Sequence, residues 1–123
     1  MPARRILIVE DNADSRWAMR LLLEYEGHHV DEAEDGVAGL DAALNGTYDI
    51  GLLDLHVPLL DGYALARKIR AAGRPMVLIA LTGAGLDRDR EAALDAGFDA
   101  YILKPISPQA LVALIADPPV GRD

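Results

Sequence analysis

The stretch GLLDLHVPLLDGY, residues 51–63, joins an apolar run to a bend and then to the start of a second apolar pattern. The run ends in the carboxylate of Asp54, and Pro58 with the Asp61-Gly62 pair marks a turn and a helix start. A lone acid after a strand is most often a cap of a turn or helix. Asp54 therefore has to be interpreted together with the polar residues that end the other strands.

The same strand-and-helix unit runs along the whole chain. Strands are predicted at residues 5–9, 28–33, 48–54, 76–81 and 99–104, and helices at 13–26, 36–45, 60–72, 87–96 and 107–116. Four of the strands are almost wholly apolar, whereas HHVDEA at 28–33 is polar enough for a sheet edge. Right-handed crossovers then favour a doubly wound, flavodoxin-like α/β fold, with a five-stranded parallel sheet of order 2-1-3-4-5 and five helices.

Length and composition fit one compact domain. The 123 residues are 51% hydrophobic and 26% charged without a composition shift, which predicts a single domain over 1–123 with a core at 4–116 and a tail at 117–123. No apolar run approaches the roughly 20 residues that cross a bilayer, and no signal-peptide core follows MPARR. We therefore expect a cytoplasmic protein without membrane contact.

The charge pattern excludes further classes. The formal net charge is -8 and the basic residues are scattered, which argues against direct binding of nucleic acid or anionic membranes. Without cysteine, disulfides and thiolate metal sites are excluded.

Polar residues end four of the predicted strands. In a doubly wound sheet the ligand crevice lies beyond the carboxyl ends of the strands, where the strand order reverses. The residues that meet there are Glu10, Asp11, Asp54, Thr82 and the Lys104-Pro105 pair. Three carboxylates at one place repel one another, and a hard divalent cation relieves that repulsion. We therefore expect a site for Mg²⁺ or Mn²⁺.

Phosphate is the natural ligand of such a site. A phosphoryl group would contact the metal, the Lys104 ammonium and the Thr82 hydroxyl, which together make a phosphoryl-transfer site. Aspartate is an established covalent acceptor of phosphoryl groups, and Asp54 lies centrally. Asp54 is therefore the predicted nucleophile, with Lys104 and Thr82 as its catalytic partners.

The motifs ILIVEDN, LLDLHVPLLDGY, ALTG and AGFDAYILKPI together resemble the receiver domain of bacterial two-component response regulators of the chemotaxis-regulator type, over residues 4–116. The resemblance implies that Asp11, Asp54 and the backbone carbonyl of His56 bind Mg²⁺, with Glu10 acting through a bound water. It also implies phosphorylation of Asp54 by a histidine kinase or a histidine phosphotransfer domain. The chain would be a stand-alone regulator or the receiver of a hybrid histidine kinase.

The same resemblance implies a switch rather than a turnover enzyme. Thr82 would move toward the phosphoryl group and Tyr101 would swing into the vacated space, while the only chemistry would be phosphorylation and dephosphorylation of the domain itself. It also implies a cis peptide bond between Lys104 and Pro105. Two positions are less usual for the family: Glu10 replaces a more frequent aspartate, and His56 would tune the phosphoaspartate lifetime.

Three other functions are weighed against this one. A phosphatase of the haloacid dehalogenase type would need a second acid at position 56, which is His56. A flavodoxin-like electron carrier would need a hydroxyl- and amide-rich loop where VEDNADS offers carboxylates. A receiver-like module that works without phosphorylation is disfavoured because every site residue is present.

Two helices carry candidate contact surfaces. A stripe in the first helix is predicted to pack against the sheet and consists of Trp17, Ala18, Leu21, Leu22 and Tyr25. Trp17 has a second interpretation as a kinase-docking anchor. In the last helix an uncharged outward face of Gln109, Ala113 and Ala116 predicts a homodimer or a neighbouring domain, although alanine there would also simply favour the helix.

Overall fold

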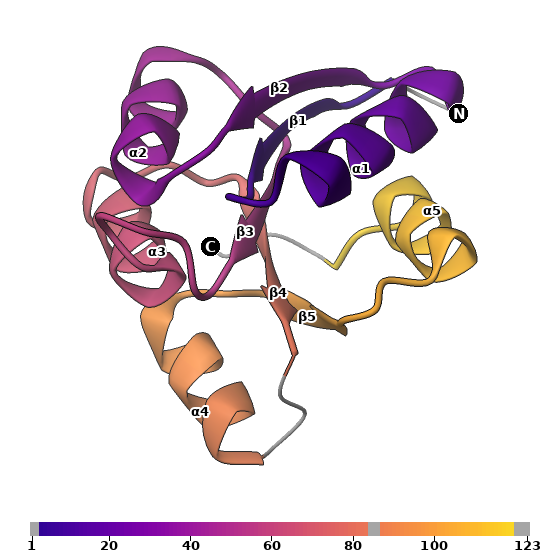
Figure 1. Cartoon of the computed structure of the whole chain (residues 1–123). Helices are drawn as coiled ribbons and strands as arrows, with labels where there is room; N and C mark the ends of the chain where they lie inside the picture. The colour runs from indigo at the N-terminus through magenta and orange to yellow at the C-terminus, as the bar shows by residue number, and fades with distance from the viewer. Residues whose placement is uncertain (1–2, 84–86, 120–123) are drawn as a thin grey trace.

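The computed structural model describes residues 3–83 and 87–119. Within them, five strands alternate with five helices (Figure 1): β1 Arg5–Val9, α1 Ala13–Tyr25, β2 His29–Ala33, α2 Gly36–Asn45, β3 Ile50–Asp54, α3 Gly62–Ala71, β4 Val77–Thr82, α4 Asp87–Ala96, β5 Ala100–Leu103 and α5 Pro108–Ala116. The strands form one sheet of order β2-β1-β3-β4-β5, and every neighbouring pair is parallel. The predicted doubly wound fold is confirmed.

Two apolar layers cover the sheet. Alternate strand residues such as Leu7, Leu53 and Leu78 form a core with residues of α2, α3 and α4. The residues between them, such as Ile8 and Leu52, form the second core with α1 and α5. Figure 1 shows α1 and α5 on one face of the sheet and the other three helices on the opposite face. Burial of both faces explains why the central strands are apolar throughout.

Side-chain caps set where helices begin. Asp61 accepts a hydrogen bond from the amide of Ala64 at 2.9 Å, so α3 starts at Gly62 rather than at the predicted residue 60. Gly62 packs against the end of β3, where a Cβ atom would lie 2.5 Å from the carbonyl oxygen of Asp54. The Asp61-Gly62 pair is therefore structural, as predicted.

The predicted packing face of α1 is wrong for most of its residues: Leu22 packs against the core, but the other four are exposed. Trp17, Leu21 and Tyr25 are 62%, 45% and 87% exposed, whereas Met19 and Leu23 are buried against the sheet. Both sets are spaced by four residues, so the apolar pattern alone allows either face. Burial of the Met19 side agrees with the ion pairs that Arg16 and Arg20 form with Glu32 of β2, because these two arginines flank that side of the helix.

The prediction for α5 is confirmed in most positions. Leu111 and Ile115 are buried, while Gln109 and Ala113 are exposed. Ala116 is half-buried instead of outward-facing. Its carbonyl accepts a hydrogen bond from the Arg4 guanidinium at 3.1 Å, which brings the start of the chain over the end of the helix. In the part of the chain that the structure describes, no helix combines the length and apolar character needed to cross a membrane.

Candidate functional site

The three predicted acids lie together beyond the ends of β1 and β3. One carboxylate oxygen from each of Glu10, Asp11 and Asp54 lies within 4.8 Å of the other two. Lys104, which follows β5, places its Nζ 2.7 Å from Oε1 of Glu10 and 2.5 Å from Oδ2 of Asp54. Thr82 ends the adjacent β4 and is 5% exposed. Thus the strand ends bring a compact acidic site together at the switch point of the sheet.

Backbone contacts hold the two buried acids. The amide of Glu10 donates to the carbonyl of Ala33 at 3.1 Å, which continues the pairing of β1 with β2 beyond the last strand residue. Asp54 is the last residue of β3, and its Oδ1 accepts a hydrogen bond from the amide of His56 at 2.8 Å. Since Glu10 and Asp54 are 1% and 5% exposed, their side chains have little freedom to leave the site.

Burial and pairing move the pKa values of these groups apart. Burial, followed by the contact with Asp54, raises the pKa of Glu10 despite the nearby Lys104. Burial also acts to raise the pKa of Asp54, but hydrogen bonds with Glu10, Lys104 and the His56 amide outweigh it and leave that pKa below its ordinary value. Asp54 is thus the carboxyl group that stays ionised, whereas Glu10 more readily holds a proton.

The lysine remains a cation in this setting. Burial acts to lower the pKa of Lys104, but its contacts with Asp54 and Glu10 outweigh burial and raise it. The bond between Lys104 and Pro105 is cis, as the resemblance implied. The lysine therefore presents a fixed positive charge beside the two buried carboxylates.

The donor atoms fit a hard divalent cation. Glu10, Asp11 and Asp54 offer oxygen ligands only, and Asp11 is exposed while the other two are buried. Such oxygen donors suit Mg²⁺ or Mn²⁺ better than softer metals. The His56 side chain is exposed, and its backbone amide donates to Asp54.

Two contacts at the site could not be found from the residue pattern. Tyr101 on β5 is half-buried, and Arg90 donates to its hydroxyl with its guanidinium 5.0 Å from the ring centroid. Arg16 donates to the backbone carbonyl of Glu10 at 2.7 Å. For the Arg16 contact, the sequence offers only an arginine early in the first helix, and such an arginine is usually a surface residue.

A doubly wound sheet with buried carboxylates and a paired lysine at its switch point defines a receiver-type signalling domain. The chain belongs to the response regulator receiver domain family, whose model matches residues 6–116. Receiver domains are signalling switches rather than turnover enzymes, and they bind Mg²⁺ at an acidic pocket.

Relatives and solved structures agree with this assignment. The response regulator MprA of Mycobacterium sp. (strain KMS) is 38% identical over 113 residues, which are 92% of this chain and 49% of MprA. The transcriptional regulatory protein ResD of Bacillus subtilis (strain 168) is 40% identical over 88% of this chain and 45% of ResD. The chain therefore spans about half the length of these relatives.

Among solved structures, a CheY-like receiver domain from Methanospirillum hungatei JF-1 superimposes with a TM-score of 0.88 and 32% identity, covering 94% of this chain and 93% of that one. The receiver domain of the sensor histidine kinase PA1611 from Pseudomonas aeruginosa PAO1 has a TM-score of 0.84 and 36% identity, covering 93% and 95%. That structure has a magnesium ion coordinated in its active site cleft.

Proposed function

We propose that the chain, as a single receiver domain with its core at residues 4–116, accepts a phosphoryl group on Asp54. The donor is a histidine kinase or a histidine phosphotransfer protein of a two-component phosphorelay. The observation that carries this proposal is the position of the Asp54 carboxyl group between Lys104 Nζ at 2.5 Å and the His56 amide at 2.8 Å, contacts that act to lower its pKa. The same site serves a stand-alone regulator or the receiver of a hybrid kinase.

The chemistry follows from this geometry. An Asp54 carboxylate oxygen attacks phosphorus, a new P–O bond forms, and the P–N bond to the donor imidazole breaks with its electron pair leaving on nitrogen. The Lys104 ammonium, which now contacts the Asp54 carboxylate, would donate to one phosphoryl oxygen. The hydroxyl of Thr82 would donate to another phosphoryl oxygen. Asp11, Asp54 and the His56 carbonyl would hold Mg²⁺ or Mn²⁺, with Glu10 acting through a water. When bound, that ion neutralises negative charge on the phosphoryl group and the acids.

Phosphorylation would then change the surface around β5. In our proposal Thr82 moves toward the phosphoryl group and Tyr101 turns into the vacated space. That rotation would separate the Tyr101 hydroxyl from Arg90, which now holds the ring near α4. A population shift between two such arrangements would present different surfaces to an output partner.

The proposed reaction is tested by phosphorylation with a small donor. Acetyl phosphate with Mg²⁺ should add one phosphoryl group per chain, measured by intact-protein mass spectrometry. Removing divalent ions with EDTA should reduce labelling to background, because the uncompensated carboxylates repel an incoming anion. Adding excess Mg²⁺ should restore labelling. Equal labelling with and without EDTA would contradict the proposed role of the ion.

Exposed groups on α1 support the proposed kinase contact. Trp17, Leu21 and Tyr25 point away from the sheet on the helix that follows Asp11. Large exposed apolar side chains of this kind are typical anchors of protein interfaces. We include Trp17 in the proposed docking surface for the histidine-containing partner.

We also propose that the uncharged face of α5 packs against a second copy or a neighbouring domain. Gln109 and Ala113 are exposed there. An Ala113→Arg variant should shift the sedimentation coefficient toward monomer or lower the signalling output, because it places a charge in a close helix contact, while leaving Asp54 labelling intact. Unchanged assembly and output would mean that alanine at this position serves only helix formation.

A further inference from the structure

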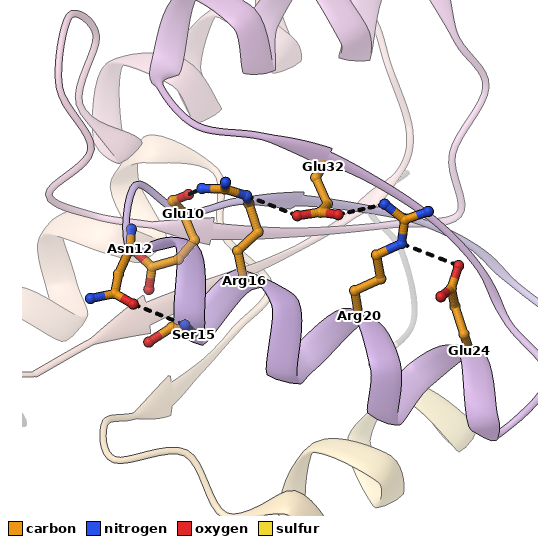
Figure 2. A network of polar contacts seen from close by, with 7 residues as sticks. All are labelled: Glu10, Asn12, Ser15, Arg16, Arg20, Glu24 and Glu32. Atoms are coloured by element: carbon orange, nitrogen blue, oxygen red, sulfur yellow. Dashed lines mark hydrogen bonds and ion pairs between the residues drawn. The ribbon is translucent and has the colours of Figure 1, made fainter.

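A polar network links the edge strand to the turn that carries the first two acids. Figure 2 shows Arg16 of α1 between the backbone of Glu10 and the carboxylate of Glu32 on β2. Its Nη1 lies 2.7 Å from the Glu10 carbonyl oxygen and its Nε lies 2.8 Å from Oε1 of Glu32. The other Glu32 oxygen accepts from Arg20 at 2.5 Å. Arg16 is the member of this network that touches the acidic turn.

The carbonyl that Arg16 binds belongs to the peptide unit that precedes Asp11. On the other side of Glu10, its amide is held by the carbonyl of Ala33 at 3.1 Å. The Glu10 backbone is therefore held from both sides, by β2 through the amide and by α1 through the carbonyl. Asp11 is exposed, so packing does not fix its side chain, and the backbone sets the direction in which its Cα–Cβ bond points.

The chemistry of arginine suits this task. Its planar guanidinium offers N–H groups in a fixed fork, so one side chain can donate to Glu10 and Glu32 together, which a lysine ammonium does less well. Glu32 balances the charge of Arg16, and the two side chains are 16% and 22% exposed. The contact therefore acts on the position of the backbone and does not serve to neutralise the acidic site.

We propose that Arg16 is a positioning residue for the proposed metal site: it holds the Glu10–Asp11 peptide so that the Asp11 carboxylate lies beside those of Glu10 and Asp54. This inference rests on the proposed function. Loss of the contact would lower the affinity for Mg²⁺ without removing a ligand. Removing a nearby positive charge would by itself strengthen cation binding, so the two effects have opposite signs.

The test is a Mg²⁺ titration of the whole chain followed by Trp17 fluorescence, with the midpoint as the readout. Arg16→Gln should raise the midpoint about tenfold, as expected when a residue that orients a metal ligand is lost. Arg16→Lys should give a smaller increase because it keeps the charge but not the fork. Phosphorylation by acetyl phosphate should be slow in Arg16→Gln at low Mg²⁺ and return to the wild-type rate at saturating Mg²⁺.

Arg20→Gln is the matched control. This substitution removes the contacts of Arg20 with Glu32 and with Glu24 at 3.3 Å, but it leaves the contact between Arg16 and Glu10 in place. Its midpoint should stay within about twofold of the wild type. Equal midpoints for wild type, Arg16→Gln and Arg16→Lys, or a lower one in Arg16→Gln, would overturn the inference. If Arg16→Gln does not fold, Arg16→Lys alone decides between these outcomes. A wild-type chain that shows no Mg²⁺-dependent change by fluorescence or in its phosphorylation would instead contradict the proposed function.

Discussion

Replacing Asp54 by asparagine is expected to abolish labelling by acetyl phosphate. The carboxamide lacks the anionic oxygen that attacks phosphorus, Glu10 holds a proton more readily and is buried at 1% exposure, and Asp11 is assigned to the metal ion. The measurement is the intact mass after incubation with acetyl phosphate and Mg²⁺, where the variant should remain at its unmodified mass. Full labelling of Asp54→Asn would show that another residue is the acceptor.

The control for this variant separates chemistry from folding. Asparagine can still accept the hydrogen bond from the His56 amide, and Lys104 keeps its contact with Glu10 at 2.7 Å. We therefore expect a melting temperature close to that of the wild type. Asp61→Asn is a matched substitution outside the site, since an asparagine can cap α3 as Asp61 does, and it should be labelled normally.

Replacing Arg70 by methionine is expected to cause the largest loss of stability. Arg70 at the end of α3 ties this helix to the segments before β4 and β5: its guanidinium donates to the carbonyls of Arg74 and Met76, to the carbonyl of Gly97 and to the carboxylate of Asp99. The Arg70–Asp99 pair is 2.7 Å long, and the two side chains are 17% and 6% exposed. Removing one residue of such a buried ion pair typically lowers the free energy of unfolding by about 3 kcal/mol or more.

The physical reason is the carboxylate left behind. Asp99 would keep the hydrogen bond from the amide of Leu78 at 2.9 Å but would lose the Arg70 guanidinium at 2.7 Å. For a chain of this size we expect a fall in melting temperature of about 10 °C, measured by circular dichroism. Arg74→Met is the matched control: the hydrogen bond that Arg74 donates to the carbonyl of Leu44 is solvent-exposed, so its loss should change the melting temperature little. Similar melting temperatures for both variants would contradict the proposed importance of the Arg70 network.

Much of the fold and the grouping of the site could be predicted from the sequence. Apolar strands alternating with helices leave few parallel topologies, and the carboxyl ends of parallel strands meet at one edge. That rule alone brings Asp54 near Glu10 and Lys104, which lie 44 and 50 residues away along the chain. The polar second strand correctly predicted the edge position of β2.

The packing face of α1 was decided only by the tertiary structure. The helix offers two apolar stripes with the same four-residue spacing, one through Trp17 and one through Met19. The folded chain packs the Met19 stripe into the core, and on that side of the helix Glu32 of β2 accepts from both Arg16 and Arg20. The sequence pattern contains no information on which distant acid an arginine will meet.

The electrostatic order within the site was also decided by the tertiary structure. The sequence places three acids and a lysine together but does not say which carboxyl group keeps its charge. That depends on burial and on individual hydrogen bonds: Asp54 accepts from both Lys104 and the His56 amide, while Glu10 is the more deeply buried. Residue order and periodicity thus determined the strands and the residues at their ends, because they are local properties of the chain. Side-chain contacts between distant segments required the folded structure. The energies of hydrogen bonds and ion pairs shorter than 3 Å depend on atomic positions that no local sequence pattern specifies.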